Sequence, residues 1–197
     1  MPRIADSTVN TVEYWDGMYK REEYPTLILA NVLRYASAAA LQTGHTALDV
    51  GCGQAGLGRK LLELHPEVFY TGWDYSQEAL RSHVIPPERE GRYRLHCGDW
   101  LAMVAVEQPH DTVYLCDFLE HLDEPGEALA MIVPLALHRM VITAPKYDVL
   151  KYKDHRGEHA WDFTEDELKA LLEPYGWVSP LADANRICAV IYVDRRK

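Results

Sequence analysis

The stretch Thr46–Gly58, TALDVGCGQAGLG, joins a short apolar run to a turn rich in glycine. Ala47, Leu48 and Val50 predict a buried strand, and the apolar period from Leu57 to Leu64 predicts the helix that follows it. Small residues in such a turn let a ligand approach the backbone, and the N–H groups at the start of the helix point towards it. The stretch therefore predicts a cradle for a nucleotide-like ligand.

The glycines of this turn, Gly51, Gly53 and Gly56, match the spacing Gly-x-Gly-x-x-Gly, and Asp74 ends the next apolar run. This arrangement is typical of nucleotide-binding domains, in which the acid binds ribose hydroxyls. A dinucleotide and S-adenosylmethionine both fit such a cradle. Asp49 favours the second ligand, because a carboxylate repels a pyrophosphate and attracts an ammonium or sulfonium group.

Composition and charge indicate a single globular domain, spanning residues 1–197, with 48% hydrophobic and 25% charged residues. The net charge of −10 argues against nucleic acid as a partner, because nucleic-acid-binding surfaces are basic. The sequence has no signal-peptide pattern and no long apolar run, so we expect a cytoplasmic protein without membrane contact. The four cysteines stand far apart in the sequence, which indicates free thiols.

Predicted strands and helices alternate along the chain. Apolar runs predict strands over residues 47–50, 68–74, 93–97, 111–118, 139–144, 177–181 and 187–193. Helical periodicity and capping residues predict helices over residues 8–20, 25–42, 57–64, 76–84 and 125–133, and from Thr164 to Gly176. This alternation, closed by a hairpin, predicts an α/β fold with a mostly parallel sheet.

The stretch around Gly51 resembles motif I of the class I methyltransferases that use S-adenosylmethionine, which has an acid two residues before Gly-x-Gly. The resemblance extends over most of the chain. It implies a three-layer Rossmann-like sandwich with a seven-stranded, mostly parallel sheet and an antiparallel strand in a C-terminal hairpin. The chain departs from the family at Ala55, where a third glycine is common, so we expect a slightly reshaped turn.

Four acids, Asp49, Asp74, Asp99 and Asp117, end successive predicted strands. Ligands of open α/β sheets bind beyond the carboxyl ends of the strands, so one crevice would receive all four side chains. By resemblance, Asp49 faces the methionine end of the cofactor, Asp74 the ribose, and Asp99 with Trp100 the adenine. An N-cap role for Asp99 is the alternative. Asp117 and Phe118 would flank the methyl-transfer position.

The N-terminal helix carries Tyr14, Trp15 and Tyr19, and its Tyr-Trp-Asp segment resembles one that in the family often lies over the cofactor pocket as a lid. An aromatic stripe that seals the core is the alternative. The full cofactor set that we expect is Trp15, Tyr19, Asp49, Gly51, Cys52, Gly53, Gln54, Asp74, Tyr75, Asp99, Trp100, Asp117 and Phe118. Residues 1–44 would then form the lid and the first helix, residues 45–197 the sheet core, and residues 145–163 a loop on the substrate side.

Methyl transfer is an in-line displacement, so the protein mainly positions the reactants and excludes water. A general base is needed only where the acceptor must lose a proton, and Asp117, His121 and His159 are the candidates. Asp117-x-x-Glu120-His121, with His155 and His159, also resembles the Glu-x-x-Glu-His pattern of metal-using methyltransferases that act on quinone rings or small RNA. Asp in the first position, and family members with Glu-His-Leu but no metal, favour a site without metal.

We therefore expect a methyltransferase that transfers a methyl group from S-adenosylmethionine to an oxygen or nitrogen atom of a small molecule. Two alternatives stay open: a metal-assisted 2′-O-methyltransferase of RNA ends, and a non-catalytic subunit that binds S-adenosylmethionine or a nucleotide. A dehydrogenase is the least favoured, because a separate substrate domain does not fit in 197 residues.

Overall fold

The computed structural model describes residues 10–20, 32–81, 90–145, 159–181 and 186–193. The first part of the helix that was predicted from Pro25, most of the predicted substrate-side loop, and His155 lie outside these residues.

Seven strands form one sheet in the order β3-β2-β1-β4-β5-β7-β6. Their bounds are Thr46–Val50 (β1), Phe69–Asp74 (β2), Tyr93–Cys97 (β3), His110–Cys116 (β4), Ala136–Pro145 (β5), Gly176–Leu181 (β6) and Arg186–Val193 (β7). Strand β7 runs antiparallel to its neighbours β5 and β6, and the other pairs in the sheet are parallel. The predicted fold class is confirmed, including the antiparallel strand of the hairpin.

Helices accompany the sheet in the order expected for an α/β fold. Their bounds are Val12–Tyr19 (α1), Val32–Ala39 (α3), Gly56–Leu64 (α4), Gln77–Arg81 (α5), Trp100–Val106 (α6), Pro125–Ile132 (α7) and Glu165–Leu172 (α9), with short 3₁₀ helices at Leu119–His121, Val133–Leu135 and Glu173–Tyr175. None of the described helices is long and apolar enough to cross a bilayer.

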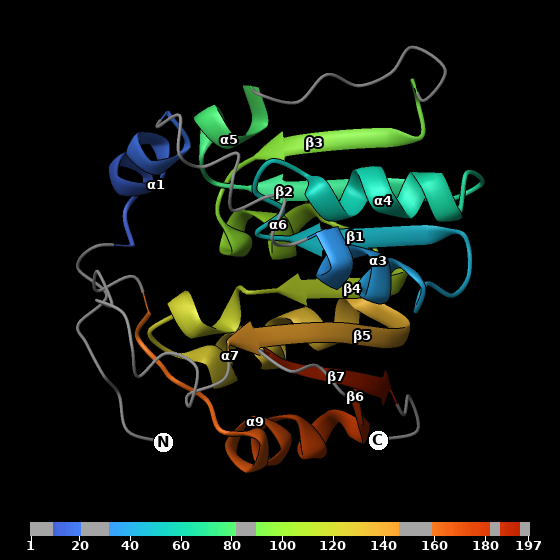
Figure 1. The fold of residues 1–197 in the computed structure, drawn as a ribbon, viewed down its shortest axis with the longest axis vertical. Helices are drawn as coiled ribbons and strands as arrows, with labels where there is room; N and C mark the ends of the chain where they lie inside the picture. The colour runs from blue at the N-terminus through green and yellow to red at the C-terminus, as the bar shows by residue number, and fades with distance from the viewer. Residues whose placement is uncertain (1–9, 21–31, 82–89, 146–158, 182–185, 194–197) are drawn as a thin grey trace.

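The alternation of side chains along β1 divides the core into two parts. Leu48 and Val50 pack with α6, α7 and α9 on one face of the sheet, whereas Ala47 packs with α3 and α4 on the other (Figure 1). Both faces are covered, which explains why the parallel strands read as apolar runs in the sequence. Burying one such leucine contributes about 1.5–3 kcal/mol relative to leaving it exposed.

Local signals fix several helix ends. Pro125 stands in the first turn of α7, and Thr164 forms a reciprocal capping box with Glu167 at the start of α9, as predicted. Strand β5 differs from the prediction, because it begins at Ala136 and not at Arg139. The polar His138, whose side chain is exposed, breaks the apolar run and hides the beginning of this strand in the sequence.

The carboxyl ends of β1 to β5 lie at one edge of the sheet, where the arrowheads meet in Figure 1, and α1 lies at this edge. Strands β3, β2, β1 and β4 are direct neighbours, so the residues that follow them come together there. This edge carries the candidate site.

Candidate functional site

The glycine turn is tightly folded, and two side chains lie over it. Gly51 and Gly53 have φ angles of 70° and 53°, in the left-handed region that favours glycine. A Cβ atom at Gly51 would lie 2.7 Å from Cδ2 of Phe118, and one at Gly53 would lie 2.7 Å from Oη of Tyr19. A larger residue at either position would therefore clash with a side chain that lies over the turn.

Ala55 also adopts a left-handed conformation, with φ of 51°, and immediately precedes α4. Its backbone nitrogen donates to the carbonyl of Cys52 at 2.8 Å, which closes the turn. The turn is thus one in which alanine occupies the strained position that a glycine commonly takes in the resembled family. The next glycine, Gly56, serves packing, because a Cβ there would lie 2.5 Å from the Tyr35 ring.

Asp74 holds the glycine turn with its carboxylate. Its Oδ2 accepts from the backbone nitrogen of Gly53 at 2.7 Å, and its Oδ1 accepts from that of Ser76 at 2.8 Å. Burial raises the pKa of Asp74 to about 6, although the two backbone N–H groups act in the opposite direction. A carboxylate in this position lies directly beside the cradle, where the sequence predicts the ribose acid.

Asp49 lies differently from the other acids. Its side chain is only 2% exposed and accepts a hydrogen bond of 2.7 Å from the hydroxyl of Tyr70, whose ring lies in the core on the α4 face. Burial raises the pKa of the Tyr70 hydroxyl well above its ordinary value, so this group keeps the proton that it donates. The structure thus places the Asp49 carboxylate beneath the turn, against Tyr70.

The remaining residues of the turn are Cys52 and Gln54. Cys52 is buried, and burial raises the pKa of its thiol, which therefore stays protonated. Gln54 is partly exposed, and its carbonyl accepts from Arg59. Neither side chain has the features of a nucleophile.

Asp99 and Trp100 follow β3. The carboxylate of Asp99 is exposed and caps α6, because its Oδ1 accepts from the backbone nitrogen of Ala102 at 2.7 Å. Trp100 is partly buried against the core. Asp99 is therefore the N-cap of α6, which was the alternative to its role at the adenine.

Helix α1 is anchored beside the cradle by Asp16, which is not among the expected cofactor residues. Oδ1 of Asp16 accepts from the hydroxyl of Ser76 at 2.5 Å and from the backbone nitrogen of Glu78 at 3.2 Å, at the start of α5. The bond from Ser76 lowers the pKa of Asp16, so this carboxylate is ionised at neutral pH. Tyr75 is partly buried in the same region, and burial raises its pKa.

The other end of α1 contacts the segment after β4. The side-chain nitrogen of Asn10 donates to the carbonyl of His121 at 2.9 Å, and Nε1 of Trp15 donates to Oδ1 of Asn10 at 3.2 Å. The rings of Trp15 and His121 meet edge to face with centroids 5.1 Å apart. Helix α1 thus bridges the cradle and the residues that were predicted to be catalytic.

Asp117 forms the corner at which β4 ends. Its φ angle is 53°, its backbone nitrogen donates to the carbonyl of Thr143 at 2.9 Å, and its Oδ1 accepts from the Thr143 hydroxyl at 2.8 Å. The next residue, Phe118, places its ring over Gly51. Asp117 and Phe118 therefore lie at the end of the cradle that is nearest to β4.

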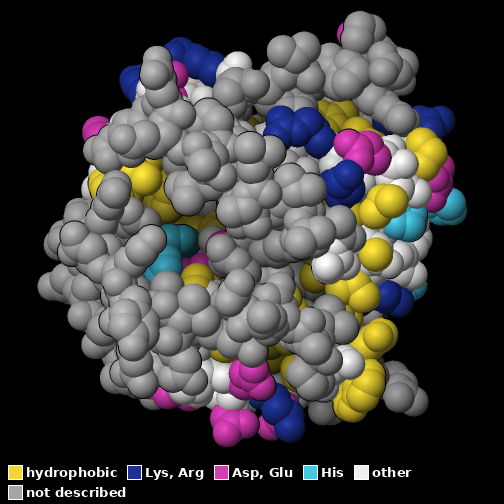
Figure 2. Space-filling model, viewed as in Figure 1, with side chains coloured by type: hydrophobic (Ala, Val, Ile, Leu, Met, Phe, Trp, Pro, Cys, Tyr) yellow, Lys and Arg dark blue, Asp and Glu magenta, His cyan; other side chains and the backbone are white. Residues whose placement is uncertain are grey.

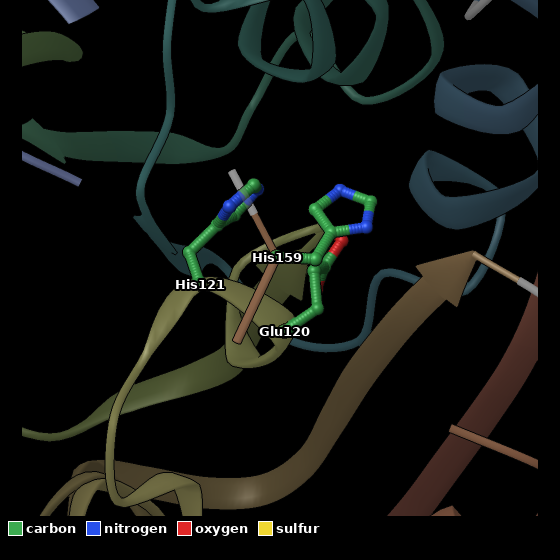
Figure 3. A group of neighbouring side chains, drawn as sticks. All are labelled: Glu120, His121 and His159. Carbon is green, nitrogen blue, oxygen red and sulfur yellow. The ribbon is translucent and has the colours of Figure 1, made fainter. Parts of the chain in front are cut away.

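Glu120, His121 and His159 form a compact group, drawn in Figure 3. One potential ligand atom from each lies within 4.8 Å of the other two. The Glu120 side chain is buried, and the two imidazole rings have centroids 5.0 Å apart. Figure 2 shows histidine, acidic and hydrophobic side chains together in a hollow in the left half of the viewed face.

The segment that carries His159 is bound to the segment after β4. The backbone nitrogens of Ala160 and Trp161 both donate to the carbonyl of Glu120, at 2.8 and 3.2 Å. Nε1 of Trp161 donates to the carbonyl of Leu122 at 2.8 Å. These bonds fix His159 beside His121 although the two residues are far apart in the sequence.

Asp162 stands behind His159, with its Oδ1 3.9 Å from Nδ1 of the imidazole. Both side chains are largely buried. Asp162 was not among the residues predicted from the sequence, and its spacing of three residues from His159 is the signal that was missed.

A carboxylate with two imidazoles is a donor set that Zn²⁺ and other divalent transition metals accept. Two ligands at about 2.1 Å from one ion lie at most about 4.2 Å apart, so small movements would bring these atoms into range. Of the residues that the metal hypothesis names, the structure brings together Glu120, His121 and His159. The Asp117 carboxylate is bonded to Thr143 instead, and His155 lies outside the described residues.

The sheet order, the glycine turn and the acids beside it define the fold of the class I, Rossmann-like methyltransferases. Residues 48–138 match the family model described as a methyltransferase domain, and no curated protein matches the sequence. The resemblance to class I methyltransferases is therefore confirmed.

Solved structures support the same assignment of fold. An O-methyltransferase family protein from Burkholderia thailandensis aligns with a TM-score of 0.72 at 13% identity, covering 95% of this chain and 62% of its own. The plantazolicin methyltransferase BpumL, in complex with S-adenosylhomocysteine, aligns with a TM-score of 0.68 at 15% identity, covering 93% and 95%. The methyltransferase domain of bacterial CtHen1-C aligns with a TM-score of 0.66 at 20% identity, covering 83% and 98%. The chain thus spans less than two thirds of the Burkholderia protein and nearly all of the other two.

Proposed function

We propose that the protein is a methyltransferase that transfers a methyl group from S-adenosylmethionine to an oxygen or nitrogen atom of a small molecule. One observation carries the proposal. The glycine cradle with Asp74, and the group of Glu120, His121 and His159, lie at the same edge of the sheet and are bridged by α1. A cofactor and an acceptor that bind at this edge would be neighbours.

The cradle fits S-adenosylmethionine in its chemistry. Asp74 would accept hydrogen bonds from the ribose, and it is bonded to the glycine turn over which Phe118 and Tyr19 lie. Two structural neighbours were crystallised with S-adenosylhomocysteine and S-adenosylmethionine, the plantazolicin enzyme and the human N-acetylserotonin methyltransferase. The cofactor supplies a methyl group that is already activated by a sulfonium, so the protein needs to position it and exclude water.

The residues after β4 would handle the acceptor. His121 and His159 present two adjacent imidazoles, either of which would be the general base for a hydroxyl or amine acceptor. The Asp117 carboxylate is the third candidate base. We further propose that residues 1–197 form one domain, that residues 1–44 supply the lid and first helix, and that residues 145–163 select the acceptor.

Calorimetric titration with S-adenosylhomocysteine tests the cofactor assignment, with NAD as the control ligand. We expect micromolar binding of S-adenosylhomocysteine, no binding of NAD, and loss of binding in Asp74→Ala. Asp166→Ala, which removes an exposed acid of α9, is the matched control and should bind as the native chain does. Failure of both ligands to bind would overturn the proposal, and binding without methyl transfer to any acceptor would favour a non-catalytic subunit.

The acceptor class is tested with methyl-transfer assays on panels of small phenols, hydroxy acids and amines. We expect turnover of at least one class, and a loss of rate in His121→Ala or His159→Ala that depends on pH. Turnover of peptides alone would contradict the small-molecule assignment. Among the structural neighbours, the plantazolicin enzyme was crystallised with desmethyl plantazolicin analogs.

The second candidate function is a metal-assisted 2′-O-methyltransferase of RNA ends. The group of Glu120, His121 and His159 favours it. The net charge of −10 weighs against an RNA partner. A metal at this group would act as a Lewis acid on the acceptor oxygen.

Titration with Co²⁺ and Mn²⁺ decides whether this group binds metal. The metal-assisted function predicts stoichiometric binding that is lost in Glu120→Gln, together with methyl transfer to RNA ends that a chelator abolishes. The absence of stoichiometric metal in the purified protein and in these titrations would rule it out. His138→Ala, an exposed histidine away from the group, controls for non-specific binding.

A further inference from the structure

Among the residues that the structure describes, two that are not glycine have a positive φ angle. They are Ala55 and Asp117. A left-handed conformation costs roughly 1–2 kcal/mol for an ordinary L-residue, and somewhat less for Asp. Ala55 belongs to the glycine turn. Asp117 stands at the end of β4, so its conformation needs a separate explanation.

Thr143 supplies this explanation. Its backbone carbonyl accepts from the Asp117 backbone nitrogen at 2.9 Å, and its hydroxyl donates to Oδ1 of the same residue at 2.8 Å. Thr143 therefore contacts both the backbone and the carboxylate of Asp117. These two bonds define the corner and the direction of the carboxylate together.

The Thr143 hydroxyl is an unusual group at its position. Thr143 is 2% exposed in β5, between the apolar residues Ile142 and Ala144 and opposite Cys116 of β4. A buried hydroxyl costs free energy unless it forms a hydrogen bond, so an apolar β-branched residue would suit the strand alone. The bond to Asp117 compensates this cost, which ties the identity of residue 143 to the carboxylate at the site.

The corner at Asp117 also sets the position of the residues after it. Phe118 comes next and lies over Gly51 of the cradle, and the 3₁₀ helix that carries Glu120 and His121 begins one residue later. Asp117 thus directly precedes the residue that covers the cradle, and its carboxylate is held by Thr143 of β5. The proposed methyl-transfer position lies at the β4 end of the cradle.

We propose that Thr143 is a positioning residue that holds the Asp117 carboxylate beside the cofactor, so that the site favours the positively charged sulfonium of S-adenosylmethionine over the neutral thioether of the product. The inference rests on the proposed function. A carboxylate a few ångströms from a sulfonium attracts it in a partly dry site, whereas the thioether of S-adenosylhomocysteine gains nothing from this charge. The ratio of the two dissociation constants therefore depends on the position of the carboxylate and can be measured before the acceptor is identified.

The test compares the dissociation constants of S-adenosylmethionine and S-adenosylhomocysteine by calorimetry in native protein and Thr143 variants. In Thr143→Val, which keeps the branched shape and removes the hydroxyl, we expect the preference for S-adenosylmethionine to fall about three- to tenfold. Thr143→Ser retains a hydroxyl and should restore most of the preference. Asp117→Asn should lower the preference at least as much, and adding Thr143→Val to it should have little further effect.

Thr112→Val is the matched control. Thr112 is fully buried in the neighbouring strand β4, and its hydroxyl bonds to the backbone of Thr43 at the opposite end of the strand. This variant should lose stability without a change in the ratio of the two dissociation constants. If Thr143→Val does not fold, Thr143→Ala replaces it. The alanine variant also lacks the hydroxyl, so we expect the same fall in the preference for S-adenosylmethionine.

The outcomes separate this inference from the proposed function. If neither compound binds to the native protein, the proposed function fails. If both bind but the ratio is unchanged in Thr143→Val, or if Thr143→Ser loses the preference as fully as valine does, the positioning role of Thr143 is wrong while the cofactor assignment stands. An equal weakening of both ligands in Thr143→Val would also overturn the inference, because it indicates packing alone.

Discussion

The Asp74 carboxylate is bonded to the backbone of the glycine turn, with Oδ2 2.7 Å from the nitrogen of Gly53. Because burial raises the pKa of Asp74 to about 6, the charge on this carboxylate changes within the range in which the protein can be studied. A ribose diol donates two hydrogen bonds, which an ionised carboxylate accepts more strongly than the protonated acid, because protonation turns one oxygen into a donor and leaves fewer acceptor sites. Cofactor binding and the protonation of Asp74 are therefore linked.

We expect the affinity for S-adenosylhomocysteine to fall as the pH is lowered from 7.5 to 5. At one unit below a pKa of about 6, only about one tenth of the carboxylate is ionised, so the dissociation constant should rise up to about tenfold. Calorimetry across this pH range measures the effect. Asp74→Asn keeps the histidines and should flatten the profile. A native profile that is already flat would contradict the role of Asp74.

Protonation of Asp74 also changes the stability of the fold, and its pKa determines the direction of the change with pH. Its pKa in the folded protein lies above the ordinary value of 3.8, so the folded state binds the proton more tightly than the unfolded chain does. The contribution of Asp74 to stability is therefore complete below pH 4 and is lost as the pH rises through about 6. Urea unfolding of native protein and Asp74→Asn at pH 4.5 and 7 measures this difference, and a contribution that grows with pH would contradict it.

Substitution of Gly53 tests whether the glycine turn binds the cofactor. In Gly53→Ala the new Cβ would lie 2.7 Å from Oη of Tyr19 and would occupy a backbone conformation with φ of 53°. We expect a loss of at least about tenfold in affinity for S-adenosylhomocysteine and a loss of stability of about 1–2 kcal/mol. Calorimetry and urea unfolding measure the two effects.

Gly17→Ala is the control for this substitution. Gly17 lies within α1, and a Cβ there would have no atom within 4 Å. The change should raise helix stability by roughly 0.5–1 kcal/mol at most and leave binding unaltered. If Gly53→Ala and Gly17→Ala had equal effects on the affinity for S-adenosylhomocysteine, the conformation of Gly53 would have no role in ligand binding.

Much of the fold could be predicted because its signals are local. The strand that ends at Cys97, the start of α7 at Pro125 and the capping box at Thr164 were each indicated by a few neighbouring residues. The antiparallel final strand followed from the turn between two apolar runs. These features need no knowledge of distant contacts.

The directions of side chains at the strand ends were harder to predict. Asp49 alternates with Leu48 and Val50 and points with Ala47 towards α4, but a strand that is buried on both faces shows no polar alternation from which to read this. The bond from Tyr70 depends on register with the next strand. The expected contact of Asp49 with the methionine end is therefore a prediction that binding measurements must decide.

The grouping at the substrate side depends on long-range contacts. His159 reaches His121 only because the backbone after it bonds to the Glu120 carbonyl. Asp16 and Thr143 act through partners that are far away in sequence, Ser76 and Asp117. The sequence shows that such residues are polar, but it does not show which distant group is their hydrogen-bond partner.

Asp16 connects α1 to the cofactor side, and its removal tests whether this helix is a lid. Asp16→Ala would free the hydroxyl of Ser76 and the backbone nitrogen of Glu78. We expect a three- to tenfold faster dissociation of S-adenosylhomocysteine, which corresponds to about 0.7–1.4 kcal/mol and is less than the two lost bonds would contribute in full. Stopped-flow fluorescence of the native tryptophans measures the rate.

Glu13→Ala is the control for Asp16, because Glu13 is an exposed acid on the same helix. Its rate of dissociation should match that of the native protein. If Asp16→Ala and Glu13→Ala release the ligand at the same rate, α1 packs beside the cradle without covering it.

Tyr70 tests whether Asp49 is a structural or a ligand-binding acid. Tyr70→Phe removes the hydroxyl that donates to Oδ2 of Asp49 and leaves that carboxylate buried with one partner fewer. We expect a loss of about 1–3 kcal/mol in the free energy of unfolding, because a buried acceptor loses its donor. Urea unfolding measures this loss.

The matched control is Tyr175→Phe, whose hydroxyl lies 3.4 Å from the carbonyl of Gly126 and should contribute little. Binding of S-adenosylhomocysteine separates the two roles of Asp49. If Tyr70→Phe destabilises the protein but keeps the native affinity, the bond supports the turn from below. If affinity falls together with stability, Tyr70 orients Asp49 for the ligand. A variant as stable as native would mean that the Asp49 carboxylate does not depend on Tyr70, contrary to the buried bond of 2.7 Å.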